Sequence, residues 1–217
     1  MKLRKLNTKF YVLFLCITAF ILNSCENMQQ RTLPIYNPAD FKPELVDKNL
    51  KNKTTNHTVS DFNLINQNGQ TITQDNYKNK IYVTDFFFTR CGSICPIMTA
   101  NMVKIQDEFI DNDDIMLLSL SVTPDIDSVS VLRDYATNKG VIDTKWNVTT
   151  GNKKHIYELA RKSYFAVVEQ GDGGFQDFIH TPNFILIDKN KQIRGIYDGT
   201  NDDAIDRIIN DIYSLKN

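Results

Sequence analysis

The sequence predicts an α/β domain in which a central mixed β-sheet is flanked by helices and extended at its front by a β-hairpin. Two apolar runs, 81–88 and 115–122, are rich in β-branched and aromatic residues, which is typical of strands buried on both faces. Each run is followed by a segment whose apolar residues recur at helical spacing. The chain then closes with two further apolar runs around a short polar turn and with a final helical pattern.

The first half of the domain begins with the hairpin. It is predicted where Asn68-Gly69, a pair typical of tight hairpin turns, separates two short strand patterns at 62–65 and 70–73. A β-α-β unit with a right-handed crossover follows over 81–122. Its helix begins at Pro96, because proline has no amide hydrogen to donate and suits the first turn of a helix.

The second half of the domain contains shorter elements. A helix begins at Val129, another covers 153–162, and a strand is expected at 165–169 before a glycine-rich turn. The remaining elements, in order, are a strand at 184–187, a tight turn at 188–191, a strand at 192–197 and a helix at 202–215. A β-α-β half joined to a β-β-α half around a buried sheet is the thioredoxin arrangement, so we predict a thioredoxin-like fold.

The N-terminus has the pattern of a targeting segment. Basic residues precede an apolar run, 10–22, which fits a secretory signal and is short for a membrane span. The run ends in Leu22-Asn-Ser-Cys25, which resembles the lipobox of bacterial lipoproteins, whose cysteine is acylated.

We therefore predict a signal peptide at 1–24, a lipidated tether at 25–60 and the domain at 61–217. The domain is then extracytoplasmic and lipid-anchored to a bacterial membrane, and we expect it to face the periplasm. An uncleaved N-terminal anchor is the alternative and leaves the domain on the same side. The choice between inner and outer membrane stays open, as does the oligomeric state.

Charge and cysteine content narrow the function. The 217 residues carry a formal net charge of -1. The protein therefore lacks the strong positive potential that attracts nucleic acid, and we expect no nucleic-acid partner. Of four cysteines, Cys16 lies in the predicted signal and Cys25 carries the predicted lipid. Cys91 and Cys95 remain, in a compartment where disulfides can persist. Two thiols are too few for a four-cysteine zinc cage, so we expect them to act together.

These two cysteines lie on the turn between the strand at 81–88 and the helix that begins at Pro96. The positive end of that helix favours thiolate over thiol, and Arg90 adds a formal positive charge. The turn is therefore a candidate site for redox chemistry or for a metal.

The segment Asp85-Phe-Phe-Phe-Thr-Arg-Cys-Gly-Ser-Ile-Cys-Pro-Ile-Met98 resembles the signature of the Sco (SenC) family. Members of that family are thioredoxin-fold copper proteins that help to assemble cytochrome c oxidase. The resemblance extends over roughly 62–215 and includes Ser121-Val-Thr-Pro-Asp125, Leu132-Arg-Asp-Tyr-Ala136, Trp146, Thr150-Gly151 and a histidine, His180, eight residues before Asp188. Two positions depart from it. Ile179 stands where the family usually has Asp, with Asp177 as a possible stand-in, and Pro182 stands where an aliphatic residue is frequent.

The resemblance implies a copper site with Cys91 and Cys95 as thiolate ligands and His180 as the third ligand. Soft thiolates select Cu(I) and an imidazole can complete a three-coordinate site, whereas a role for Cu(II) stays open. In a thioredoxin-like fold, the loop before the strand at 184–187 faces the cysteine turn, which places His180 within reach. The other two histidines, His57 in the tether and His155 on a helical turn, are expected to be solvated surface residues.

The resemblance also implies partners: the copper-bearing subunit of cytochrome c oxidase, with other copper carriers as further candidates. The same dithiol is compatible with a thiol-disulfide oxidoreductase, in which Cys91 attacks and Cys95 resolves, alone or beside copper delivery. Three intervening residues argue against reduction as the sole function, since dedicated reductases use two. A peroxidase is disfavoured, because the Pro and Thr that lead into its reactive cysteine are missing. Pro182 is compatible with a cis bond, as in thioredoxins, or with a trans bond at a strand start.

Overall fold

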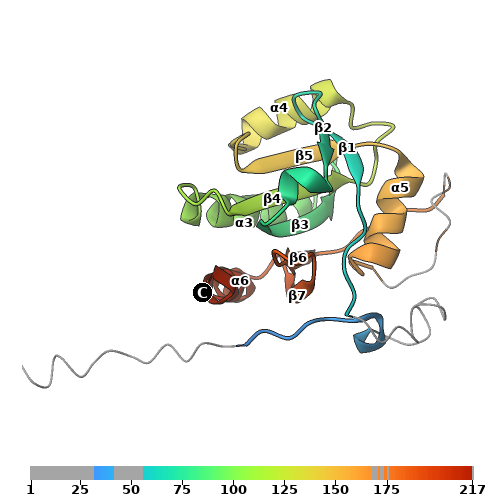
Figure 1. Cartoon of the computed structure of the whole chain (residues 1–217). Coiled ribbons are helices and arrows are strands. Elements are labelled where there is room, and N and C mark those ends of the chain that lie inside the picture. Colours follow the sequence, from blue (N-terminus) through green and yellow to red (C-terminus); the bar gives the residue numbers. More distant parts are fainter. Residues whose placement is uncertain (1–31, 42–55, 168–170, 172–173, 175, 217) are drawn as a thin grey trace, which may run out of the picture. The chain divides into compact units, whose positions relative to one another are not determined.

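The computed structural model describes residues 32–41, 56–167, 171, 174 and 176–216 (Figure 1). These residues belong to one compact unit, Thr32–Asn217. The predicted signal peptide, Cys16 and the predicted lipidation site Cys25 lie outside the described part of the chain. Within that part, no helix combines the length and the apolar character that a membrane crossing requires.

A seven-stranded mixed sheet, in the order β2-β1-β5-β4-β3-β6-β7, forms the centre of the fold (Figure 1). Three central strands are parallel: β3 (Ile81–Phe87), β4 (Ile115–Ser121) and β5 (Trp146–Thr150). The hairpin of β6 (Asn183–Ile187) and β7 (Ile193–Asp198) joins antiparallel to β3. The predicted front hairpin, β1 (Asn63–Asn66) and β2 (Thr71–Thr73), joins antiparallel to β5. The predicted α/β thioredoxin-like architecture is therefore confirmed.

Helices cover both faces of this sheet. The first core joins one face to α3 (Cys95–Glu108), α4 (Val129–Lys139) and α6 (Asp202–Lys216). The second core joins the other face to α5 (Lys153–Glu158) and to a π-helix, Leu159–Ser163, that continues from it. Successive residues of β3 alternate between the cores: Val83 belongs to the first and Tyr82 to the second. A central strand with layers on both sides is expected to be mostly apolar, and β3 is apolar except for Thr84 and Asp85.

Two predictions about elements are corrected by the structure. Strand β5 was not predicted, because Asn147 and its threonines interrupt the apolar pattern that identifies β3 and β4. The strand predicted at 165–169 is absent over 165–167, and residues 168–169 lie outside the described ranges. There the backbone turns back, with Phe165 at φ 50, and the Ala166 amide donates to the carbonyl of Ala160 at 2.8 Å.

The compact unit also begins earlier than the boundary predicted at residue 61. Arg194 of β7 donates to the carbonyls of Leu33 and Pro34, and the Tyr36 amide donates to Ile193. His57 is half-buried: its Nε2 is 2.7 Å from the Ser163 carbonyl oxygen and its ring centroid is 4.7 Å from that of Phe165. The prediction of a solvated His57 is therefore wrong, because part of the expected tether packs on the domain.

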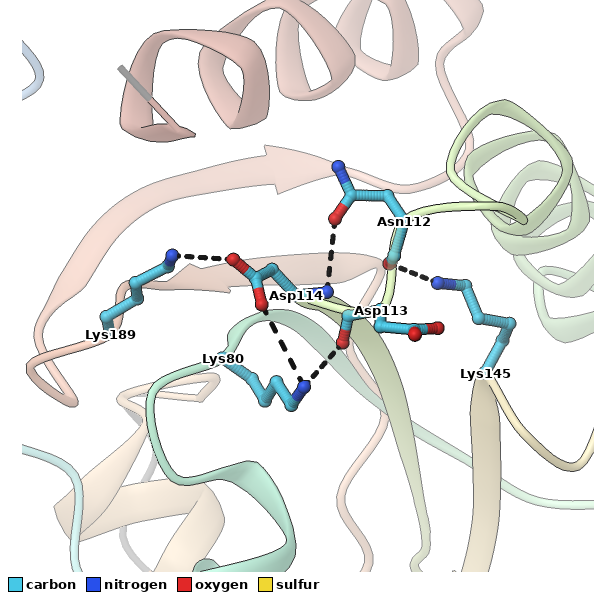
Figure 2. A network of polar contacts seen from close by, with 6 residues as sticks. All are labelled: Lys80, Asn112, Asp113, Asp114, Lys145 and Lys189. Carbon is cyan, nitrogen blue, oxygen red and sulfur yellow. Dashed lines mark hydrogen bonds and ion pairs between the residues drawn. The ribbon is translucent and has the colours of Figure 1, made fainter.

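A polar network closes the end of the sheet where β3, β4 and β5 begin (Figure 2). Lys80 and Lys189 both pair with Asp114, and Lys80 also donates to the Asp113 carbonyl. Lys145 is 3% exposed and donates to the carbonyl of Asn112. These contacts hold the N-terminal ends of the three strands together. The cysteines lie at the opposite end of the sheet, where β3 is followed by α3.

Candidate dithiol and metal site

The two thiols lie where β3 passes into α3. Cys95 is the first residue of α3 and Pro96 the second, so the helix begins one residue before the predicted start at Pro96. Cys91 lies in the preceding turn, where its amide donates to the Phe88 carbonyl at 3.3 Å. The Cys95 amide donates to Cys91 Sγ at 3.4 Å, so the helix N-terminus is aimed at the first sulfur. Both cysteines are free and buried.

The two thiols differ strongly in acidity. Burial acts to raise the pKa of Cys91, but hydrogen bonds from the Cys95 amide, the Ser93 hydroxyl and the Cys95 thiol outweigh it and lower that pKa to about 6. For Cys95, burial dominates and raises the pKa to about 12, with further contributions from the nearby Cys91 and Asp85 charges. Hydrogen bonds therefore explain the lowered pKa of Cys91. Arg90, whose positive charge was expected to contribute, is exposed and is not among the causes of the shift. The site combines one thiolate with one thiol at neutral pH.

A buried carboxylate that the sequence analysis did not single out anchors the cysteine turn. Asp127 is 0% exposed and accepts hydrogen bonds from the hydroxyl groups of Thr89, Ser121 and Thr123, and from the Thr89 amide. Thr89 is two residues before Cys91, so this cluster joins the start of the turn to the end of β4. The run of hydroxyl and acidic residues after 120 is the signal that could have revealed it.

A second buried carboxylate, Asp85, lies in β3. Its Oδ1 accepts from the Ser119 hydroxyl, and the Ser119 oxygen in turn accepts from the indole of Trp146 at 2.9 Å. Burial raises the pKa of Asp85 to about 7. The central strands thus carry a buried polar chain of three side chains, Asp85, Ser119 and Trp146.

His180 lies in the segment before β6 and is exposed. Its ring centroid is 6.3 Å from that of Phe178, with the two rings stacked, and 6.2 Å from that of Phe88, which is three residues before Cys91. Within the described ranges, no group of three or more His, Cys, Asp or Glu side chains is placed to hold a metal ion. The structure therefore brings Cys91 and Cys95 together and puts His180 beside the same turn, but it does not join all three into one ligand set.

The remaining residues singled out from the sequence have structural roles. Asp177, considered as a stand-in for the family acid, has its carboxylate engaged by Arg161. No peptide bond in the described ranges is cis, so Pro182 is trans and the cis alternative is wrong. His155 is half-buried on α5, and its Nε2 accepts from the Asn63 amide at 3.4 Å.

Comparison with known proteins points to one family. The family model described as SCO1/SenC matches residues 50–217. A curated SCO1 protein homolog from Bacillus subtilis is 33% identical over 163 residues, which cover 74% of this chain and 84% of that protein.

Solved structures agree. A SCO1/SenC family lipoprotein from Bacillus anthracis has a TM-score of 0.66 and 30% identity, covering 76% of this chain and 99% of that one. BsSco, described as a member of the Sco family of cytochrome c oxidase assembly proteins with a disulfide switch, has a TM-score of 0.63 and 32% identity, covering 73% and 93%. Sco structures with copper bound share 19%, 22% and 21% identity and support the fold alone.

Proposed function

Because this chain belongs to the SCO1/SenC family, we propose that it is a copper chaperone that binds Cu(I) and delivers it to the copper site of cytochrome c oxidase. The observation that carries the proposal is the pair of free thiols on one strand-to-helix turn, with a helix amide directed at the first sulfur. The oxidase is proposed as partner because the family relative BsSco is described as an oxidase assembly protein.

The residues present fit copper as cargo. Thiolate sulfur is a soft ligand and selects Cu(I), and one of the two sulfurs is already ionised near neutral pH. His180, beside Phe88, is the candidate third ligand, although side-chain rotation or loop movement must bring its ring to the sulfurs. A site completed by a mobile third ligand suits transfer, because hand-over to an acceptor proceeds by ligand exchange.

Membrane anchoring belongs to the same proposal. The lipobox-like Leu22-Asn-Ser-Cys25 supports a lipid on Cys25, and a relative of 30% identity is described as a lipoprotein. A lipid there would hold the domain on the extracytoplasmic side of the membrane, where the oxidase subunit to be loaded is expected. Mass spectrometry of the membrane-bound protein would test this, and an unmodified Cys25 that still follows an intact leader would refute it.

A thiol-disulfide oxidoreductase is the alternative, and the unequal acidity of the thiols favours it. Cys91 is the thiolate that attacks a disulfide, and Cys95 is the protonated thiol that resolves the mixed disulfide. In that reaction the two sulfurs are oxidised to a disulfide while the substrate disulfide is reduced to two thiols. The description of a disulfide switch in BsSco agrees with such chemistry in a relative.

Anaerobic titration of the reduced protein with Cu(I) against a competing chelator separates the two functions. We expect one Cu(I) per chain, a loss of affinity by orders of magnitude in His180→Ala, and no loss in the control His155→Ala. Cys91→Ala or Cys95→Ala should abolish binding. Unchanged affinity in His180→Ala together with rapid disulfide reduction would favour the oxidoreductase, and a wild-type protein without Cu(I) binding would refute the copper proposal.

A further inference from the structure

We propose that the ion pair between Arg161 and Asp177 is a positioning pair for His180: it sets where the segment that carries this histidine lies relative to the two cysteines. The inference rests on the proposed copper function, because it concerns the third ligand of the same site. Neither residue touches the thiols in the contacts described above, so the pair acts through the backbone of the loop.

The ion pair between Arg161 and Asp177 is strong enough to fix the start of the segment that carries His180. Arg161 Nη1 and Nη2 donate to the two oxygens of Asp177, both at 2.6 Å, and the side chains are 12% and 9% exposed. A bidentate pair of this kind fixes orientation as well as distance. Tyr157 reinforces it, since its ring lies 5.4 Å below the guanidinium carbon and its hydroxyl contacts the Asp177 carbonyl at 3.1 Å.

The second step is an anchor on the other side of His180. The Ala166 carbonyl accepts from the Thr181 hydroxyl at 3.0 Å and from the Asn183 side-chain amide at 2.8 Å. Between the two anchors, Ile179 is 3% exposed and packs in the second core. His180 therefore belongs to a span of three residues, 178–180, that is held at both ends and pinned in its middle.

The third step is the common origin of both anchors. Arg161 lies in the π-helix Leu159–Ser163, and Ala166 is the third residue after the end of that helix. The widened turn is visible in the Tyr164 amide, which donates to the carbonyl of Leu159 at 2.8 Å, and in the Ala166 amide, which donates to Ala160. A π-turn inserts a residue and redirects the side chains and carbonyls around it. The π-helix and the three residues after it thus supply both supports of the histidine span.

The consequence is preorganisation. A histidine on an unanchored loop must lose backbone freedom when it binds a metal, whereas one held beside Phe88 has mainly its own side chain to reorient. Residues that orient a metal-binding histidine typically change metal affinity by roughly 10- to 100-fold when they are substituted. Because Asp177 acts at three residues' distance, we expect an effect of about 10-fold, the lower end of that range.

The test compares Asp177→Asn with Asp188→Asn. Asp188 forms a similarly enclosed ion pair with Arg194 at 2.8 Å, with side chains 7% and 16% exposed, but it lies at the far end of β6. We expect Asp177→Asn to lower Cu(I) affinity about 10-fold and Asp188→Asn to leave it unchanged. The decisive measurement repeats Asp177→Asn in a His180→Ala background, where the loss should disappear because the ligand it acts through is gone.

A copper-free readout separates this inference from the proposed function. In the reduced protein, proton NMR should show contacts between the His180 and Phe88 rings that weaken in Asp177→Asn and persist in Asp188→Asn. If wild type binds no Cu(I), the copper proposal fails and these ring contacts still decide whether the pair positions His180. If Asp177→Asn does not fold, Arg161→Lys, which keeps the charge and loses the fork, takes its place.

An equal loss of Cu(I) affinity with and without His180 would overturn the inference, because it would show a general structural effect. Ring contacts that are unchanged in the Asp177 or Arg161 variant would overturn it as well.

Discussion

The low pKa of Cys91 leads to a direct prediction about its reactivity. At a pKa of about 6, Cys91 of the reduced, copper-free protein is almost entirely thiolate at pH 7. Its alkylation rate should therefore reach half its maximum near pH 6 and stay flat above pH 7. If this thiol had its ordinary pKa of 9.0, the rate would instead rise about tenfold per pH unit between pH 6 and 8.

The absolute rate is less informative than this profile. At pH 7 the lower pKa raises the thiolate fraction from about 1% to about 90%, roughly a 90-fold gain. A thiolate of lower pKa is also a weaker nucleophile, and three pKa units cost roughly 15- to 30-fold at the usual Brønsted slope. The net gain at pH 7 is therefore only about three- to six-fold, too small to identify the cause on its own.

The assay is iodoacetamide labelling across pH 5–9, with the modified sulfur located by fragment mass spectrometry. Ser93→Ala removes a hydroxyl 3.5 Å from Cys91 Sγ, so its midpoint should shift upward, while Cys95 should stay unlabelled throughout because its pKa is about 12. A wild-type midpoint at pH 8 or above would refute the assignment of the helix amide and Ser93 as the groups that stabilise the thiolate.

Three further predictions concern stability. Burial raises the pKa of Asp85 from 3.8 to about 7, so its favourable contribution is complete below pH 4 and is lost as pH rises through 7. Asp85→Asn should therefore raise the free energy of unfolding by up to about 4 kcal/mol at pH 8 and by little at pH 4. Urea unfolding followed by Trp146 fluorescence measures this, and equal effects at both pH values would contradict it. Ile208→Ala, at a fully buried position of α6, should lower the free energy of unfolding in urea by about 2–5 kcal/mol. The control Ile110→Ala, at a position that is 36% exposed, should lower it far less. Similar losses of stability in the two variants would refute the packing assigned to α6. Gly69→Ala should cost about 1–2 kcal/mol because φ is 77° at the hairpin turn and the new Cβ meets only ordinary contact, and a neutral result in thermal unfolding would count against that turn.

Local signals explain which elements could be predicted. The apolar run of β3 and Pro96 bound the cysteine turn, and the prediction agrees with the structure to within one residue. Strand β5 gave no such signal because its buried polar side chains have partners far away in the sequence. Asn147, for example, bonds Asn66 and the hydroxyl of Tyr77, so its burial depends on the tertiary fold.

The candidate site also combines a part that local sequence signals predict with a part that depends on the tertiary fold. The spacing of Cys91 and Cys95 at the start of a helix is a local feature, and in the structure the Cys95 amide donates to Cys91 Sγ. The position of His180 depends on Arg161, Ala166 and Phe88. These residues are distant from it in sequence, and only the fold brings them near. Family resemblance could nominate the histidine, but its separation from the sulfurs is a tertiary property.

The unequal thiols also determine how copper binding should couple to protons. Above pH 7 Cys91 has already lost its proton, whereas Cys95, with a pKa of about 12, must release one before its sulfur can bind as thiolate. Cu(I) binding should therefore release one proton, and the association constant should rise about tenfold per unit between pH 7 and 9. Two thiols at the ordinary 9.0 would release two protons and give about a hundredfold rise per unit near pH 7. Calorimetry in buffers of different ionisation enthalpy counts the protons, and a value near two would mean that the helix amide and Ser93 do not hold Cys91 as a thiolate in the copper-free protein.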